Sequence, residues 1–370
     1  MINLAQNGLP HAQVLRALQH HTGAARISFG CDVIRRGARV RRAELERGGE
    51  VNCNSLAQVK LTCRLKVKDD PMIDWFNDRL RPYMLVDVNG FTMQYPLGMY
   101  VPSTVVGNRI KEVEGYDLCV YLQEDSITER LYFPRGMRYT DAVSSVLVSA
   151  GAANASLDQN NDILLSDRED WEIGTSKLVI VNQLLGEINF RSLETGLNGN
   201  IRARQYLEPT GANVSIQYRA GDAGIVLSGA DKSNDSYNVP NVFVGVVSNP
   251  DYTEDGDALQ EFKYTYINSS PASALSTASR GRRIVAEIIR PDNIASQAAL
   301  QAYVRRSAID SMTAYEHVSF RTTPVPYHEV AEVLGMDIDG VQGVYGETSW
   351  SLPLDGSPMR HECRKLVVLR

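Results

Sequence analysis

Apolar and polar residues alternate strictly between residues 59 and 68, the clearest periodic segment of the chain. The positions between the apolar ones hold four cations and a threonine, and the apolar positions are Val59, Leu61, Cys63, Leu65 and Val67. A period of two places alternate side chains on opposite faces of an extended strand. The segment therefore predicts a strand with one face in a core and one face in water.

A tight hairpin is predicted a little further on. Residues 85–88 and 91–95 are apolar-rich and flank Asn89-Gly90, a pair that readily adopts the positive φ angles of a type I′ turn. A further strand is expected around 116–123 and one short helix near 72–79. Together these elements predict a β-rich domain over 26–132.

Helical spacing replaces the strand pattern in the next part of the chain. Thr140 is placed to cap a helix that ends at Gly151, and a second helix is predicted to start at Thr175 or Ser176. A hairpin through 195–199 completes the unit. We expect a small α+β domain over 133–211.

Strand patterns return from Asn213 and continue to the last residues, interrupted by one strong helix. That helix carries an apolar stripe at Leu300, Val304, Ala308, Met312 and Tyr315. Strands are expected at VSIQY, GIVLSG and VFVGVV, and over 264–268, 284–289, 344–352 and 359–369. Two β-rich regions thus bracket helical material.

A short internal echo links the two β-rich regions. Residues 87–91 read Asp-Val-Asn-Gly-Phe and residues 337–341 read Asp-Ile-Asp-Gly-Val. Both are typical of a tight hairpin turn inside a β domain. Such turns are common, so two unrelated hairpins would explain the echo equally well.

Composition narrows the class of protein. A chain of 370 residues with 43% hydrophobic and 22% charged residues is expected to form two or three soluble globular units. It contains no apolar run approaching the roughly 20 residues of a membrane-spanning helix, and its first residues do not follow the pattern of a secretion signal. We expect synthesis in a cytoplasm, with the five cysteines as buried free thiols.

Charge is acidic overall but has a basic exception. The net charge of −6 argues against a surface that grips nucleic acid throughout. A dense arginine segment nevertheless comprises Arg35, Arg36, Arg39, Arg41, Arg42 and Arg47. It is either a solvated segment between strands or a surface for phosphate or an acidic protein.

Residue patterns for catalysis and metal binding are incomplete. The segment His328-Glu329-Val330-Ala331-Glu332 lacks the second histidine of a zinc-protease helix. Three further histidines, His11, His20 and His21, fall in an N-terminal arm that we expect to be mobile. The acidic segment 251–257 starts like a calcium loop, but Phe262 occupies the position of its bidentate glutamate.

Carboxylate pairs are the remaining catalytic possibility. Asp167 with Glu169, or Asp170 with Glu172, could serve as a glycosidase acid and nucleophile if their separation were suitable. The chain has no P-loop, no dinucleotide-binding GxGxxG and no GxSxG motif. We therefore expect no enzyme, no catalytic residue, no cofactor and no metal ion.

Several segments in order resemble the hub proteins of phage tail tips and baseplates. They are IDWFNDRLRPY at 73–83, YPLGMYV at 95–101, YTD at 139–141, LVIVNQLL at 178–185, QYLEP at 205–209, VPNVFVGVVS at 239–248, WSLPL at 350–354 and MRH at 359–361. Each motif alone is weak, whereas their order and spacing are more specific. The resemblance covers most of residues 26–370.

This resemblance implies a mainly β fold with two β-barrel domains related to the tail-tube fold and two small α/β domains. After an arm at 1–25, the first barrel would span 26–132 and the small α+β domain 133–211. The second barrel would comprise 212–250 and 319–370, interrupted by an inserted α+β domain at 251–318.

The function implied by the resemblance is structural. A homotrimer would present six similar barrels and adapt the six-fold tail tube to the central tip. Partners would be the tail tube or distal tail protein, the tape measure protein, tip, spike or receptor-binding proteins, and passing DNA. The protein would be assembled in the host cytoplasm and reside in the virion. Because this chain ends soon after its last expected strand, lytic or host-binding activity is expected from another chain.

Candidate contacts with a neighbouring ring or with DNA follow from the charge pattern. They are Arg35, Arg36, Arg39, Arg41, Arg42, Lys60, Arg64 and Lys66. Two other classes of function stay open: a tail-associated cell-wall hydrolase, and a peripheral carbohydrate-binding or fibre adaptor.

Overall fold

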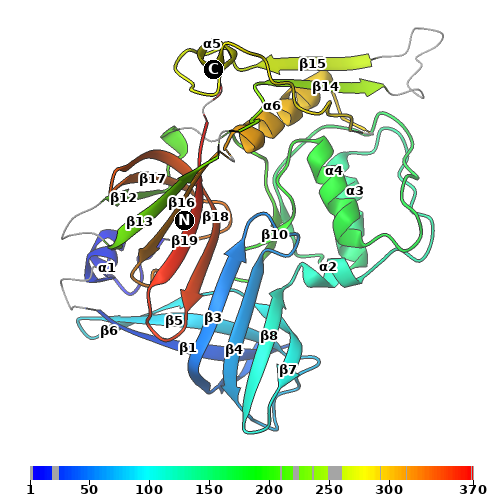
Figure 1. Cartoon of the computed structure of the whole chain (residues 1–370). Coiled ribbons are helices and arrows are strands. Elements are labelled where there is room, and N and C mark those ends of the chain that lie inside the picture. The colour runs from blue at the N-terminus through cyan, green and yellow to red at the C-terminus, as the bar shows by residue number, and fades with distance from the viewer. Residues whose placement is uncertain are drawn as a thin grey trace.

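The computed structural model describes residues 3–18, 25–208, 211–219, 225–235, 237–248, 261–291, 293–313, 315–367 and 369. The structure is mostly β, with 41% strand and 17% helix, which confirms the mainly β class. Figure 1 shows two strand-rich regions that lie against each other, a helical unit beside them and a further unit above. One 14-stranded sheet runs through both strand-rich regions.

The first barrel is closed by a bent strand. Its strands are β1 (Ala25–Arg35), β2 (Ala38–Ala43), β3 (Leu45–Asn54), β4 (Leu61–Lys68), β5 (Arg79–Val88), β6 (Phe91–Pro96), β7 (Tyr100–Val106) and β8 (Ile110–Asp117). The strand order is β3-β4-β8-β7-β5-β1-β2. Only Glu44 separates β2 from β3, so one bent segment pairs with β1 through its first half and with β4 through its second. The ring of strands therefore closes on itself.

The alternating segment forms strand β4 as the sequence predicts. Leu61, Cys63, Leu65 and Val67 are buried, whereas the residues between them face outward. The hairpin at Asn89-Gly90 is also confirmed, with φ angles of 51° and 85°.

The short helix expected at 72–79 does not form. The side chain of Asp74 accepts a hydrogen bond from the backbone N–H of Phe76, and that of Asp78 accepts one from the N–H of Asp74. Such local side-chain bonds compete with helical backbone bonds and favour turns. The segment is a loop of turns between β4 and β5.

The second barrel is built from β12 (Ile216–Arg219), β13 (Val226–Asn234), β16 (Glu316–Thr322), β17 (Val333–Ile338), β18 (Val341–Pro353) and β19 (Met359–Lys365). Their order is β13-β16-β19-β18-β17-β12. The sheet is rolled, because the rings of Tyr218 in β12 and Phe320 in β16 meet edge-on with centroids 5.1 Å apart. The N–H of Gly229 in β13 also donates to Asp339 in the β17–β18 turn, at 3.0 Å.

The two barrels repeat the same strand register. Pairs Leu45↔Val67 and Cys53↔Leu61 in β3 and β4 match Val226↔Thr322 and Asn234↔Glu316 in β13 and β16, and both pairings contain a bulge at the same step. The β7–β8 pairs match the β18–β19 pairs in the same way, with one bulged residue in each. The β5–β6 and β17–β18 hairpins share type I′-like turns with positive φ at both central residues. The echo in the sequence therefore marks equivalent hairpins.

The barrels are joined within the chain by one strand pairing. Residues 349–353 of β18 pair antiparallel with residues 50–54 of β3, from Ser349↔Asn54 to Pro353↔Glu50. The same half of β18 pairs with β19 on its other side. The barrels therefore share a continuous sheet.

A helical unit follows the first barrel. It contains α2 (Val120–Glu124), α3 (Tyr139–Ser149), α4 (Lys177–Glu187) and a small sheet of β9 (Ser156–Leu157), β10 (Glu194–Thr195) and β11 (Ile201–Ala203). The Ser176 hydroxyl accepts a bond from the N–H of Val179, which confirms the predicted start of α4. Helix α3 instead begins one residue before Thr140, with Arg138 at its N-cap and no side-chain cap bond.

The upper unit in Figure 1 contains β14 (Val242–Ser248), β15 (Glu261–Ile267), α5 (Thr277–Arg280) and α6 (Gln297–Thr313). The sequence predicts residues 242–248 in the second barrel, but β14 pairs with β15 in a separate two-stranded sheet that α6 covers. Gly245 explains the difference, because a Cβ there would lie 2.3 Å from Val304 of α6. Residues 284–289 form single bridges to β14 and no strand.

The N-terminal segment packs on the barrels. Helix α1 (His11–Leu18) buries Val14, Ala17 and Leu18, and Leu4 is fully buried in the same core. The Nδ1 atom of His11 accepts a hydrogen bond from the N–H of Leu4. The expectation of a mobile arm is therefore wrong for residues 3–18, because their apolar side chains face the core.

The only 3-10 turn in the described ranges is η1 (Gly211–Asn213).

Candidate functional site

The arginine segment lies on β1–β3 of the first barrel, and two of its members are held by acidic side chains. Arg35 binds both carboxylate oxygens of Asp78, at 2.7 and 2.8 Å, and Arg41 lies 2.9 Å from Asp70. The guanidinium of Arg35 lowers the pKa of Asp78. These contacts fasten the 69–78 loop to the barrel, so they have a structural role.

The other arginines of the segment are more exposed. Arg42 stacks over the ring of Tyr83, and Arg39 lies 3.9 Å from Asp32 while more than half of its side chain is in solvent. Arg36 is exposed in the β1–β2 turn with φ of 50°. The six arginines all lie within the segment β1–β3, and Arg36, Arg39, Arg42 and Arg47 are exposed.

The three cations predicted on the β4 strand separate into two environments. Arg64 and Lys66 face outward and pair across the sheet with Glu114 at 3.0 Å and Glu112 at 3.7 Å. Lys60 is 4% exposed and its Nζ donates to the carbonyl of Ala57. Burial lowers the pKa of Lys60. Lys60 precedes the strand and therefore does not belong to its outer charged face.

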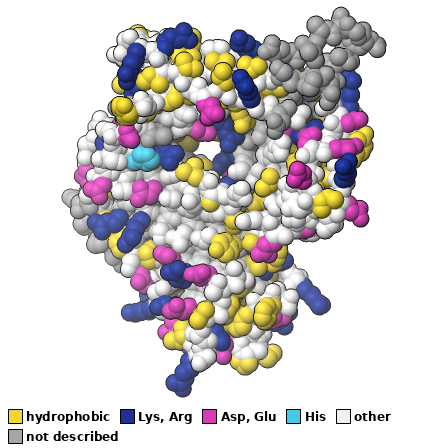
Figure 2. Space-filling model, turned by 45° about the vertical axis from the view of Figure 1, so that its right-hand side comes forward, with side chains coloured by type: hydrophobic (Ala, Val, Ile, Leu, Met, Phe, Trp, Pro, Cys, Tyr) yellow, Lys and Arg dark blue, Asp and Glu magenta, His cyan; other side chains and the backbone are white. Residues whose placement is uncertain are grey.

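Lys60 lines a cavity of about 770 Å³ between the barrels, the helical unit and the upper unit. Figure 2 shows an opening beneath the uppermost unit with Lys and Arg side chains at its rim. The ring of Tyr206 packs under Arg306 there, with the guanidinium 4.6 Å from the ring centroid. The charged residues lining the cavity are Lys60, Arg191, Arg204, Arg306, Arg364, Asp158, Asp310, Glu332 and Glu347. Both signs occur, so the lining does not select one class of ligand.

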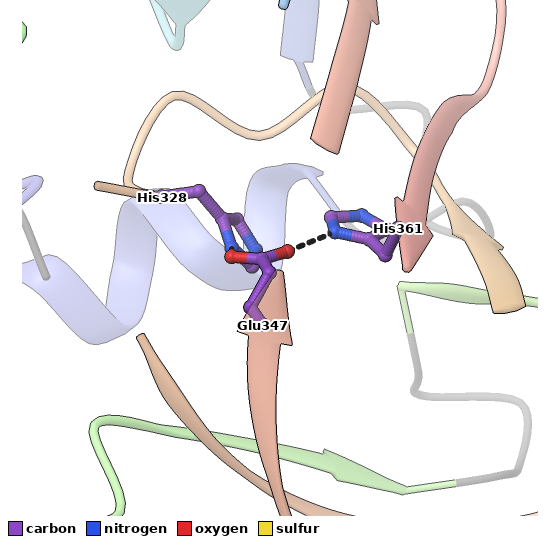
Figure 3. Close-up of side chains that lie close together, drawn as sticks. All are labelled: His328, Glu347 and His361. Carbon is purple, nitrogen blue, oxygen red and sulfur yellow. Dashed lines mark hydrogen bonds and ion pairs between the residues drawn. The ribbon is translucent and has the colours of Figure 1, made fainter. Parts of the chain in front are cut away.

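A buried polar cluster lies inside the second barrel. His328 comes from the connection between β16 and β17, Glu347 from β18 and His361 from β19, and all three are at most 3% exposed. Figure 3 shows the Glu347 carboxylate between the two imidazoles. Its oxygens lie 2.6 Å from Nδ1 of His328 and 2.7 Å from Nδ1 of His361.

Two hydroxyl groups complete this cluster. The hydroxyl of Tyr218 bonds to Nε2 of His328, and that of Thr322 lies 2.9 Å from Nε2 of His361. If each Nδ1–H donates to Glu347, each Nε2 can accept from a hydroxyl, and every polar atom has a partner. The five residues come from five different segments, so the network ties the barrel together through its centre.

Burial sets the protonation of the network. Desolvation raises the pKa of Glu347 to about 7 and lowers the pKa values of His361 to about 4 and His328 to about 3. At neutral pH both imidazoles are therefore neutral, which suits the hydrogen bonds described above.

These three residues also offer donor atoms of the kinds that bind metal ions. Among the described residues this is the one group of three or more such side chains with donor atoms within 4.8 Å of one another. Each donor already takes part in a hydrogen bond, so an ion would have to replace the protons between Glu347 and the imidazoles. The arrangement is a closed hydrogen-bond network.

Sequence reasoning missed this cluster because its members are 14 to 33 positions apart. Residues 326–332 lie in turns and connecting segments, so the His328-Glu329 motif is not on a helix. The one available signal was alternation: Met359, His361 and Cys363 share a face of the last strand and are all buried.

Among the carboxylates considered for glycoside hydrolysis, Asp167 accepts a hydrogen bond from the N–H of Arg135, and Glu169 and Asp170 lie beside arginines. Arg168 is buried and binds Asp170 and both oxygens of Glu187, while Glu169 lies near Arg130. The ring of Trp171 packs edge-on against Phe133. These groups stabilise the helical unit. The acidic segment 251–257 lies entirely outside the described residues.

All five cysteines are free and buried, as predicted. None of the helices in the described part of the chain is long and apolar enough to cross a membrane.

Comparison with solved structures identifies the fold. The chain superimposes on a tail protein from Neisseria meningitidis with a TM-score of 0.61 at 14% identity, covering 91% of this chain and 97% of that one. A 43 kDa tail protein of prophage MuSo2 from Shewanella oneidensis gives 0.55 at 13% identity, over 91% and 98% of the two chains. Prophage tail protein gp18 from Listeria monocytogenes gives 0.56 at 10% identity, over 90% and 94%.

The chain therefore has the fold of phage tail proteins. Because the sequence identities are only 10–14%, the similarity establishes the fold alone. It confirms the fold that the sequence resemblance implied. No family model and no curated protein sequence matches the chain.

Proposed function

We propose that the chain is a structural subunit of a phage tail tip or baseplate, a hub that adapts a six-fold tail tube to the central tip. The observation that carries this proposal is the repeated barrel, since the two barrels share strand order, bulges and hairpin turns. Three chains would present six nearly equivalent barrels around one axis. A trimer could then match six-fold symmetry on one side and three-fold symmetry on the other.

The ring would surround the path of the DNA. Its partners would be the tail tube or distal tail protein, the tape measure protein, and tip, spike or receptor-binding proteins in the virion. The helical unit near 133–211 and the upper unit would stand as appendages on the two barrels. The fold similarity to prophage tail proteins supports this role.

The role is structural rather than catalytic. Asp170 and Glu187 pair with Arg168, and the cluster of His328, Glu347 and His361 is buried in the second barrel. Zymography against bacterial cell walls tests the hydrolase alternative, and a cleared zone would support it. Binding in a glycan array without ring formation would favour the peripheral adaptor.

Electron microscopy of the purified chain and of assembled particles tests the hub directly. We expect three-fold rings with six similar densities around an open centre. A monomer at high concentration together with a peripheral position in the particle would contradict the proposal.

The basic segment can be tested separately. Arg36→Glu together with Arg39→Glu reverses two exposed charges, neither of which fastens the 69–78 loop. If these residues face a neighbouring ring or DNA, tail assembly or infectivity falls. The matched control is Arg130→Glu, on an 85% exposed side chain of the helical unit. Equal infectivity of both variants would remove the segment from the proposed contacts.

A further inference from the structure

The repeated barrels differ at one place, the strand edge that joins them. In the first barrel, β3 pairs with β4 on one side and with β18 on the other. Its counterpart in the second barrel, β13, pairs with β16, and no strand of the described residues covers its other edge. The junction thus pairs the outer edge of β3, whereas the equivalent edge of β13 is left unpaired among the described residues.

The complementary edge is open as well. Strand β18 gives residues 349–353 to the junction, and its counterpart β7 pairs with β8 in the matching register. On its other side β7 makes a single pair, Leu80↔Tyr100, within the described ranges. Residues 101–106 of β7 therefore carry an unpaired edge.

Strand β6, which comes just before β7 in the chain, already has its outer edge covered by the N-terminal segment. Gln6 exchanges two hydrogen bonds with the backbone of Gln94 in β6, at 3.0 and 3.2 Å. The side-chain amide of Asn7 donates to the carbonyl of Thr92 at 2.8 Å. The N-terminal segment thus covers β6 and stops short of β7, as expected if another strand occupies β7.

The side chains on the paired edges are buried, whereas those on the two unpaired edges are more exposed. In the covered strand β3, Val51 and Cys53 are 0% and 2% exposed. The corresponding residues of β13 are Lys232 and Asn234, and residues 231–235 are exposed throughout. On the other partner, Trp350 and Leu352 of β18 are buried, whereas Val105 is half-buried and Val106 is 62% exposed.

We propose that β7 of one chain pairs antiparallel with β13 of a second copy, repeating between chains the β18–β3 junction that lies within each chain. This inference rests on the proposed ring. The matched registers convert Ser349↔Asn54, Trp350↔Cys53 and Ser351↔Asn52 into specific intermolecular pairs. The pairs are Thr104↔Asp235, Val105↔Asn234 and Val106↔Ser233.

The partner of this surface is therefore the chain itself. An open edge strand invites pairing with any other strand, and charged residues limit wrong pairings. Asp231 and Lys232 supply such charges on β13, Asp235 follows directly after it, and the exposed Arg109 lies in the turn after β7. Closing both edges in every chain leaves neither of them exposed in the ring.

Disulfide trapping tests the register. Directly opposed residues of antiparallel strands have Cα atoms about 4.5 to 5.5 Å apart, within disulfide reach. Because the native cysteines are buried, cysteines introduced by Val106→Cys and Ser233→Cys would react selectively. We expect the double variant to form a covalent trimer on mild oxidation, and each single variant to stay uncrosslinked.

The matched control is Val106→Cys with Lys232→Cys, whose side chains leave opposite faces of the shared sheet. Equal crosslinking of both double variants would overturn the register. Three-fold rings in the microscope without any Val106–Ser233 link would overturn the strand pairing and leave the hub standing. A crosslinked ladder that extends past three chains would keep the strand pairing and overturn the closed ring.

Discussion

The two barrels share one backbone pattern, but three matched interior positions are apolar in the first barrel and polar in the second. Val67, Pro102 and Val113 of the first barrel occupy the register positions that Thr322, Glu347 and His361 occupy in the second. The first set is apolar, and the second set belongs to the hydrogen-bond network around Glu347. Bulges and turns at fixed positions therefore maintain the register, while the chemistry at these three positions differs.

The polar interior is tolerated because it is complete. A buried polar group without a partner costs about 1 to 3 kcal/mol, whereas a satisfied one costs little. Glu347 receives both imidazoles, and each imidazole reaches a hydroxyl. At the matched positions the second barrel therefore has hydrogen bonds where the first has apolar side chains.

The largest effect is expected from Glu347→Ala. This change leaves both imidazole N–H groups without an acceptor in a buried site, so we expect a loss of about 3 to 5 kcal/mol in the free energy of unfolding. Urea unfolding followed by circular dichroism measures it. Pro102→Ala at the matching position of the first barrel is the control and should cost under about 1 kcal/mol. Equal losses would show that the two interiors do not differ in this way.

The second effect concerns pH. The pKa values of His328 and His361 are lower in the folded chain than in the unfolded one, so their contribution to stability is present above about pH 6.5 and is lost as pH falls toward about 4. The raised pKa of Glu347 acts in the opposite sense, because its contribution is present below about pH 4.5 and is lost as pH rises through about 7. The histidines dominate on the acid side.

Replacing both histidines tests this balance. In the double variant His328→Asn with His361→Asn, the two histidines no longer reduce folding stability as the pH falls. Only the pH dependence caused by Glu347 remains. The stability difference between wild type and variant should change by about 1.4 kcal/mol per pH unit for each histidine between pH 6 and 4.5. Urea unfolding at several pH values measures it. Parallel pH profiles would rule out the network as their source.

The smallest effect lies on the outer faces. The Lys66↔Glu112 pair of the first barrel corresponds to Arg321↔Arg360 in the second, where two exposed cations face each other. Arg360→Glu should therefore raise stability by about 0.2 to 1 kcal/mol at low salt. Lys66→Glu should lower it by a similar amount. Thermal unfolding at low and high salt checks both, and a shift that salt leaves unchanged would contradict the electrostatic cause.

Much of the fold could be predicted where the pattern is local. The alternation of β4, the Asn89-Gly90 hairpin, the Ser176 cap of α4 and the apolar stripe of α6 are all present. Local side-chain bonds explain the missing helix at 72–79, since Asp74 and Asp78 compete with the helical backbone. The placement of β14 depended on Gly245 meeting Val304 about 60 positions away, which no local pattern reveals.

By itself the sequence determined the periodicity of the elements, the turns, the free buried thiols and, through ordered motifs, the kind of fold. Only the tertiary structure decided which edges pair, where Lys60 lies, and that His328, Glu347 and His361 meet in one core. The physical reason is that periodicity depends on neighbours along the chain, whereas strand pairing and burial depend on residues brought together by folding. The β3–β18 junction joins positions about 300 residues apart, and it reveals where a second copy would bind.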